Sequence, residues 1–206
     1  MAVRVLDHPL AGELLAVLRE ASTKPSAFRS ASQTLAAMLA LESTRGLRTR
    51  AATVTTPLEV APVQRLDQGL AIIPILRAGL GLLQPFIDLF PDVAIGYVGL
   101  ERDETTAVAR IYYSKLPCLN GRFVILLDPM LATGGSASHA IRLAKESGAE
   151  QVTLTSVVAA PQGIARVEAD HPDVPIVTAS VDRDLNALKY ILPGLGDYGD
   201  RLFGTP

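Results

Sequence analysis

Residues Val124-Ile-Leu-Leu-Asp-Pro-Met-Leu-Ala-Thr-Gly-Gly-Ser136 join an apolar run, one acid and a turn of small residues. A helical pattern follows over residues 137–147, so the stretch predicts a buried strand, a loop and a helix N-terminus in series. The free N–H groups and the dipole of a helix N-terminus attract anions. Thr133 and Ser136 can add hydroxyl donors, and the glycines let the backbone approach an anion closely. We therefore expect a phosphate site at this turn.

Asp128, the acid between the strand and the turn, points to a more particular ligand. A carboxylate suits sugar hydroxyls or a bound metal, which a glycine loop alone does not need, so we interpret the site as one for a phosphosugar. The stretch is not a Walker loop, because no Gly-Lys-Ser/Thr ends it. The alternative is a structural strand–turn–helix with an incidental aspartate, but the combination of acid, paired glycines and two hydroxyls favours a functional site.

A second glycine loop, Arg77-Ala78-Gly79-Leu80-Gly81, follows another predicted strand over residues 70–76. In a parallel sheet this loop could lie beside the first one and complete a cradle for a diphosphate. Arg77 offers several donors for bidentate contacts with such an anion. The alternative is a tight strand–helix turn with a solvated arginine.

A third loop, Pro193-Gly-Leu-Gly-Asp-Tyr-Gly-Asp200, contains the GxGxxG pattern of dinucleotide-binding proteins. That pattern must open a helix after a first strand, and here it lies near the end of the sequence with no room for a βαβ unit. A glycine-rich loop with two acids instead suits a flat ligand that is bound through backbone groups. An exposed tail is the alternative.

The remaining polar residues give weaker signals. Arg102 lies in the charged segment 101–107, where it could close over a polyanionic ligand or simply be solvated. Three histidines lack the spacing of metal ligands and are interpreted as structural or surface residues: His8, His139 and His171. No Ser/His/Asp or Cys/His set is evident in the sequence, which disfavours covalent catalysis.

Strand and helix patterns alternate along the chain, which predicts an α/β fold with a doubly wound, mostly parallel sheet and flanking helices. Strands are expected over residues 70–76, 93–100, 109–113, 124–127, 152–158 and 176–179. Helices are expected from Pro9 onward and over residues 26–43, 80–89, 137–147 and 162–169. Residues 51–65 contain two prolines among β-branched residues and predict a β-arm, which suggests dimerisation.

Composition narrows the class of protein. A chain of 206 residues fits a single domain over residues 1–206, and 49% hydrophobic residues allow a sizeable core. A net charge of −2 argues against a dedicated nucleic-acid binder. No apolar run is long enough for a membrane span, and no signal-peptide core is evident. The only cysteine, Cys118, is interpreted as a structural thiol, so we expect a cytoplasmic protein without membrane contact.

Three segments resemble the uracil phosphoribosyltransferase family, whose members have the type I phosphoribosyltransferase fold. They are Pro74-Ile-Leu-Arg-Ala-Gly-Leu-Gly81, Asp128-Pro-Met-Leu-Ala-Thr-Gly-Gly-Ser136 and Tyr190-Ile-Leu-Pro-Gly-Leu-Gly-Asp197. Weaker similarity runs from His8 to Gly204, so the resemblance spans nearly the whole chain. The second segment is highly specific, because most type I relatives have two consecutive acids where this family has Asp-Pro.

The resemblance implies a pyrimidine-salvage enzyme that condenses uracil with 5-phospho-α-D-ribose 1-diphosphate (PRPP) to give UMP and diphosphate. It implies Mg²⁺ held mainly through PRPP with no direct protein ligand, a small C-terminal base-binding hood, a homodimer or higher homo-oligomer, and allosteric binding of a GTP effector. It also implies a cis peptide between Arg77 and Ala78.

The same resemblance implies roles for individual residues. Asp128, Arg77 and Arg102 are the expected catalytic residues, the acid on the ribose hydroxyls and the arginines near the diphosphate. The expected PRPP-binding residues are Arg77, Arg102, Asp128, Pro129, Met130, Leu131, Ala132, Thr133, Gly134, Gly135, Ser136 and Asp197. The expected uracil-binding residues, which act through their backbone, are Ile191, Gly196, Asp197 and Tyr198.

Three positions depart from the family pattern. Tyr198 stands where alanine is usual, so either backbone recognition tolerates the ring or the ring narrows the base pocket. Asp184 replaces a glycine and Gln162 replaces a glutamate, both outside the PRPP loop. Two rivals stay open: a purine phosphoribosyltransferase, which would lack the C-terminal loop, and a non-catalytic RNA-binding pyrimidine regulator on this fold, which would want a basic surface.

Overall fold

The computed structural model of the chain describes residues 3–102 and 109–205. Within these residues, nine strands form one sheet in the order β1-β11-β10-β8-β4-β6-β7, with β5 beside β4 and β9 beside β10. All pairs are parallel except β6 with β7. The strands are β1 Val3–Val5, β4 Gly69–Leu76, β5 Ala94–Ile95, β6 Tyr97–Arg102, β7 Ala109–Lys115, β8 Arg122–Leu127, β9 Met130–Leu131, β10 Gln151–Ala159 and β11 Ile176–Val181.

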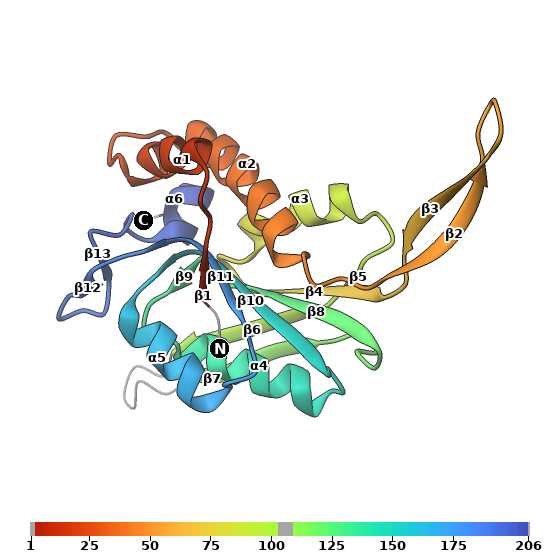
Figure 1. The fold of residues 1–206 in the computed structure, drawn as a ribbon. Coiled ribbons are helices and arrows are strands. Elements are labelled where there is room, and N and C mark those ends of the chain that lie inside the picture. Colours follow the sequence, from red (N-terminus) through yellow and green to blue (C-terminus); the bar gives the residue numbers. More distant parts are fainter. Residues whose placement is uncertain (1–2, 103–108, 206) are drawn as a thin grey trace.

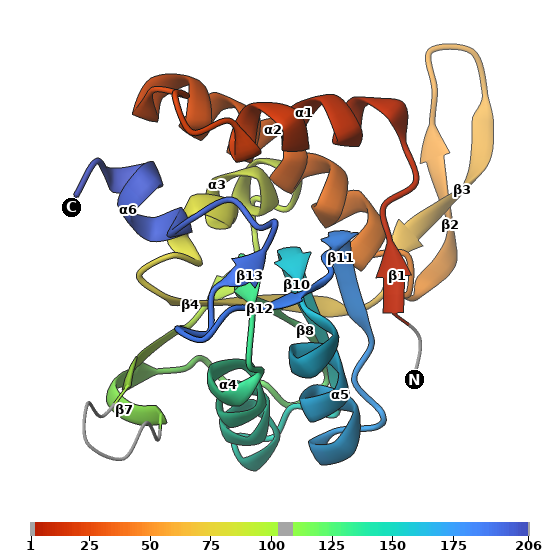
Figure 2. The same cartoon turned by 90° about the vertical axis from the view of Figure 1, so that its left-hand side faces the viewer.

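Helices cover both faces of this sheet (Figure 2), as a doubly wound fold requires. Helices α1, α2 and α3 lie on one face, and α4 and α5 lie on the other. Their bounds are α1 Pro9–Arg19, α2 Pro25–Ser43, α3 Leu80–Leu89, α4 Gly135–Glu146, α5 Pro161–Asp170 and, at the C-terminal end, α6 Tyr198–Phe203. The predicted α/β class with a mostly parallel sheet is confirmed.

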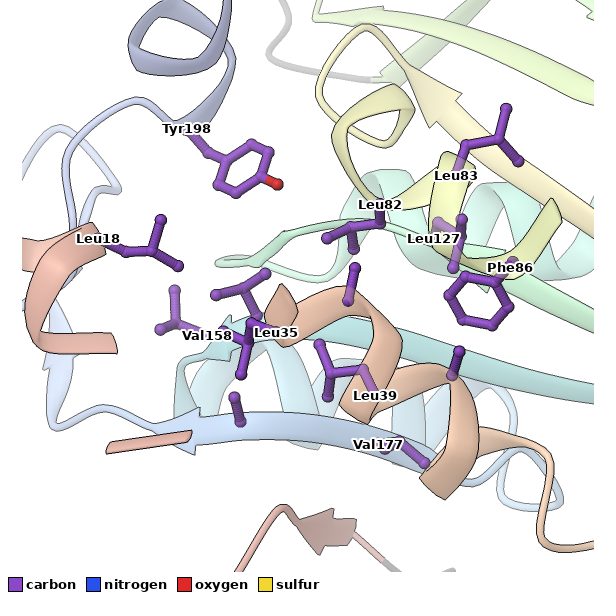
Figure 3. Close-up of a cluster of buried hydrophobic side chains, with 14 of the residues drawn as sticks. Leu18, Leu35, Leu39, Leu82, Leu83, Phe86, Leu127, Val158, Val177 and Tyr198 are labelled. Atoms are coloured by element: carbon purple, nitrogen blue, oxygen red, sulfur yellow. The ribbon is translucent and has the colours of Figure 1, made fainter. Parts of the chain in front are cut away.

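Strand β8 shows why the central strands are continuous apolar runs. Its alternate residues Phe123, Ile125 and Leu127 join the core beneath α1–α3, part of which is drawn in Figure 3. Val124 and Leu126 join the second core, beneath α4 and α5. Side chains of a strand alternate between faces, so a strand that is covered on both faces must be apolar at every position.

The chain reverses its direction across the sheet beside β4. From β4 it crosses through α3 to β5 and β6 on one side, and after β7 it returns to β8 on the other side of β4. The β4–β8 pairing runs up to Pro74 opposite Leu127, which brings the ends of the two strands level. Ligands of open α/β sheets bind at such a switch point, at the carboxyl ends of the strands. Both predicted phosphate loops leave from there.

Two smaller sheets lie outside this body. The predicted arm is a hairpin of β2 Thr49–Thr55 and β3 Val60–Leu66 that projects away from the rest of the molecule (Figure 1). A second hairpin, β12 Asp184–Leu185 with β13 Ile191–Leu192, precedes α6. We use the word hood for residues 184–204, which comprise this hairpin, the following loop and α6.

Most element predictions are confirmed, and the differences have local causes. The strand expected over residues 93–100 divides at Gly96, whose N–H instead bonds the carbonyl of Ile72 on β4. The strand through Pro74 is not interrupted, because this proline falls at the end of the β4–β8 ladder, where a missing N–H costs least. Strand β1 and helix α6 were not predicted, since three and six residues are too short to show a period.

Candidate active site

The phosphate-sized loop is built by close contact between two glycines. Gly134 precedes α4 with φ 78°, a left-handed conformation that favours glycine. A Cβ on Gly134 would lie 2.7 Å from the carbonyl oxygen of Gly163 in α5, and one on Gly163 would lie 2.6 Å from that of Ala132. The loop therefore rests directly on the first turn of α5. Within the described residues no side chain caps α4, so its first N–H groups are available to an anion.

Asp128 stands at the end of β8, beside the start of this loop. Its N–H donates to Thr155 on β10 at 3.0 Å, which fixes the backbone. Burial raises the pKa of the Asp128 carboxyl to about 7, although a hydrogen bond from the Met130 N–H acts in the opposite direction. Among the described side chains the Asp128 carboxylate has no ion-pair partner, and a carboxylate that has lost water in this way favours a ligand that brings hydroxyl donors or a cation.

Arg77 begins the second glycine loop, at the end of β4. A Cβ on the nearby Gly79 would lie 2.5 Å from the Leu127 carbonyl oxygen, so this loop packs onto the end of β8, next to Asp128. The Arg77 side chain is largely exposed and lies 3.4 Å from an Asp200 carboxylate oxygen. Exposed pairs of this kind are weak, so an anionic ligand can displace Asp200. The cis peptide lies between Leu76 and Arg77, one bond earlier than predicted.

These groups share one cavity of about 200 Å³ at the switch point. Most of the predicted PRPP-binding residues line it: Arg77, Asp128, Met130, Ala132, Thr133, Gly134, Gly135 and Ser136. Pro129 and Leu131 do not line it; they are buried and their carbonyl oxygens accept bonds from β10 and Ala160, so they hold the loop in place. The side chain of Arg102 lies outside the described residues.

A second cavity, also of about 200 Å³, adjoins the first. It is lined by the four residues that were expected to bind the base, and also by Lys189, Tyr190 and Gly199. Both cavities are lined by Ala78, Met130 and Ala132, so they share a wall. Asp197 lines this second cavity rather than the first, and its carboxylate caps α6 by accepting from the Asp200 N–H.

The Tyr198 ring lies in the hydrophobic core (Figure 3), where it packs against α2. The residue is 1% exposed, its ring packs edge-on to Phe28 at 5.3 Å between centroids, and its hydroxyl is hydrogen-bonded to Ser32. Of the two alternatives at this position, the burial of the ring favours backbone contact with a ligand.

The other two departures from the family pattern contact each other. The Gln162 side-chain amide donates to the Asp184 carboxylate, which also accepts from the Leu185 N–H at 2.7 Å. A glutamate at position 162 would repel that carboxylate, whereas the amide bonds it. The pair joins α5 to the hood and lines neither cavity.

Helix α6 is the part of the site that sequence reasoning missed. The signals that could have found it are a capping aspartate, Asp197, and Gly204 at the far end with φ 72°. The three histidines do not line the cavities; His8 caps α1, and His171 bonds Ser138 on α4. Cys118 is exposed, so it is not the packed structural thiol that was expected.

Phosphoribosyltransferases share this arrangement of a doubly wound sheet with an acid and a glycine-rich loop at its switch point. A hypoxanthine phosphoribosyltransferase of Staphylococcus aureus has the same fold, with 13% identity and a TM-score of 0.51 over 84% of this chain and 82% of that one. The family model described as uracil phosphoribosyltransferase matches residues 5–205, so the chain belongs to the uracil phosphoribosyltransferase family.

Individual relatives support that membership. The uracil phosphoribosyltransferase of a Thermoanaerobacter species is 46% identical over 98% of each chain, and that of Thermosipho africanus is 44% identical over 100% of each. A solved structure of an Aquifex aeolicus protein is 35% identical, with a TM-score of 0.93 over 98% of each chain. In the part of the chain that the structure describes, no helix is both long and apolar enough to cross a membrane.

Proposed function

We propose that this protein forms UMP and diphosphate from uracil and PRPP as a single phosphoribosyltransferase domain over residues 1–206. The observation that carries the proposal is the pair of cavities with a common wall. One offers an anion loop and a desolvated acid, and the other offers backbone groups of a glycine-rich loop. A phosphosugar and a flat base can therefore meet at Ala78 and Ala132. Membership of the family supports the choice of uracil.

The first cavity is assigned to PRPP. The 5′-phosphate would accept hydrogen bonds from the N–H groups of residues 132–136 and from the hydroxyls of Thr133 and Ser136. Asp128 would accept from the ribose hydroxyls. Arg77 would leave Asp200 and pair with the diphosphate, together with Arg102. These arginines stabilise the negative charge that gathers on the departing diphosphate.

The second cavity is assigned to uracil, which would be bound through the backbone of Ile191, Gly196, Asp197 and Tyr198. Uracil presents a donor at N3 between acceptors at O2 and O4, whereas cytosine presents an acceptor at N3 beside an amino group. Fixed backbone N–H and C=O groups can match only one of these patterns. Uracil N1, having lost its proton to solvent, would face the common wall and bond to ribose C1 as the bond from C1 to the diphosphate oxygen breaks through an oxocarbenium-like state.

Mg²⁺ is the proposed cofactor, and the residues fit a metal that PRPP itself carries. Within residues 3–102 and 109–205 no cluster of three or more histidine, cysteine or acidic side chains could hold an ion. Mg²⁺ commonly binds substrate phosphates with one or two carboxylates and several waters, and Asp128 is the acid that lines the first cavity. When bound, the ion would neutralise diphosphate charge.

An assay of UMP formation with a panel of bases tests this proposal. With PRPP and Mg²⁺, uracil should give UMP, while cytosine and hypoxanthine should react at least about 100-fold more slowly, because each leaves backbone groups unpaired. Chelation of Mg²⁺ should abolish turnover. Equal use of hypoxanthine, or binding of RNA without turnover of any base, would contradict the proposal. Activation by added GTP and a cytoplasmic location stay predictions.

A further inference from the structure

Tyr198 is the first residue of α6, and its ring is packed in the hydrophobic core. The hydroxyl bonds Ser32 on α2, and the ring edge packs against Phe28 of the same helix. Burial raises the pKa of Tyr198 above its ordinary value, so the hydroxyl stays protonated and able to form this bond. The same residue lines the second cavity together with Gly196, Asp197 and Gly199, and because its ring is packed against α2 we assign this contact to its backbone.

The ring also rests on the first turn of α3. A Cβ on Gly81 would lie 2.7 Å from the Tyr198 hydroxyl oxygen and 2.9 Å from a ring carbon. Gly81 is the last residue of the glycine loop that begins with Arg77, and it lies in the first turn of α3. The Tyr198 side chain therefore contacts both α2 and the start of α3. The ring is thus held between α2 and α3, as the neighbourhood in Figure 3 shows.

Arg201 fixes the other side of α6. Its guanidinium donates to the carbonyl oxygens of Leu18, of Glu20 at 2.6 Å and of Leu195 at 2.7 Å. It also lies over the Phe28 ring, 4.6 Å from the centroid. A six-residue helix has little stability of its own, so these contacts decide where α6 and the preceding loop lie.

We propose that Tyr198 is a positioning residue for the base, which fixes the backbone of residues 196–199 against α2 and α3. The inference rests on the proposed function, in which that backbone binds uracil. Backbone donors and acceptors cannot change direction by a side-chain rotation. Their position relative to the base therefore depends on the contacts that hold the loop in place. Misplacement by about 1 Å can cost on the order of 100-fold in rate. The Tyr198–Ser32 hydrogen bond is expected to set the KM for uracil.

The experiment compares Tyr198→Phe and Ser32→Ala with the unchanged protein in steady-state kinetics. Each variant should raise the KM for uracil roughly 5- to 10-fold and change the KM for PRPP less than about twofold, because only the base loop shifts. The double variant should be no worse than the poorer single variant, since both remove the same bond. Phe86→Leu is the control: Phe86 is buried in the same core but lines neither cavity, so it should lower Tm without changing the KM for uracil.

An unchanged KM for uracil, or an equal rise for both substrates, would overturn the proposal. A second measurement does not depend on activity. Amide hydrogen exchange in Tyr198→Phe should accelerate at residues 196–199 and stay unchanged at the start of α4. Unchanged exchange at residues 196–199 would overturn the anchor. The two proposals can also fail separately. If the unchanged protein forms no UMP but exchange at residues 196–199 accelerates in Tyr198→Phe, the proposed function is wrong, while the conclusion that Tyr198 holds this loop in place is supported.

Discussion

Asp128 is the residue at which the requirements of binding and of stability conflict. Its pKa is raised by burial to about 7, from an ordinary value of 3.8, so the folded protein binds a proton more readily than the unfolded chain. The stability that this group contributes is therefore complete below pH 3.8 and is lost as pH rises through 7. A raised pKa at an acid that lines a cavity favours the hypothesis that a ligand compensates for the lost water.

The variant Asp128→Asn separates the two requirements. The asparagine cannot ionise, so the variant does not lose stability as pH rises. The difference in free energy of unfolding between the variant and the unchanged protein should therefore grow by on the order of 2 kcal/mol from pH 5 to pH 8. The variant's kcat/KM for PRPP should fall roughly 100-fold or more, because the ribose hydroxyls lose a charged acceptor. Thermal melts at several pH values and steady-state kinetics measure the two effects.

Asp173→Asn is the matched control, because a hydrogen bond from Lys145 lowers the pKa of that exposed carboxyl. It should be slightly less stable than the unchanged protein at pH 8 and equally active. The account of Asp128 is contradicted if Asp128→Asn shows the same stability difference at pH 5 and pH 8, or retains full activity.

The contact between α5 and the loop of residues 132–136, to which we assign PRPP, gives a prediction at the scale of elements. Alanine in place of a helical glycine normally stabilises a protein by up to about 1 kcal/mol. Gly12→Ala in α1 should do so, because a Cβ there has nothing within 4 Å. Gly163→Ala should instead lower Tm and raise the KM for PRPP, because its Cβ would press on the carbonyls of Leu131 and Ala132. Melting curves and PRPP titrations decide; similar behaviour of the two variants would refute the close contact.

The elements that could be predicted from sequence are those with a periodic pattern over many residues or a continuous apolar run. Strand β8 and helix α4 follow directly from the pattern around Asp128, and the arm follows from prolines among β-branched residues. The hood could not be predicted in detail, because it consists of two-residue strands and the short α6. Such elements are stabilised by contacts far away in sequence, such as that between Ser32 and Tyr198, which no local pattern contains.

At the scale of the whole molecule, the projecting arm leads to a prediction about oligomeric state. A two-stranded hairpin is marginal alone, and this one exposes Leu58 at 95% and Val60 at 64%. We therefore predict a homodimer or a higher homo-oligomer that buries the arm. Leu58→Asp with Val60→Asp should shift sedimentation velocity toward the monomer. Leu188→Asp, at another strongly exposed leucine, which lies in the hood, should not. A monomeric unchanged protein would contradict the prediction.

The meeting of the two cavities is also a property of the whole molecule that sequence could only suggest. The sequence contains three separate loops, but the reversal beside β4 and the return of the C-terminal chain over the sheet bring them to Ala78, Met130 and Ala132. The direction of the Tyr198 ring depends in the same way on α2, more than 160 residues earlier in the chain. Tertiary packing, not local propensity, decides such features.

A crystal structure with bound UMP tests the central claim, that the two adjoining cavities are the halves of one site. We predict the phosphate on the N–H groups of residues 132–136, the ribose hydroxyls on Asp128, and the base on the backbone of Ile191 and residues 196–198. A nucleotide bound in another cavity, or one whose base lies away from the hood while its phosphate lies on the loop, would contradict the account.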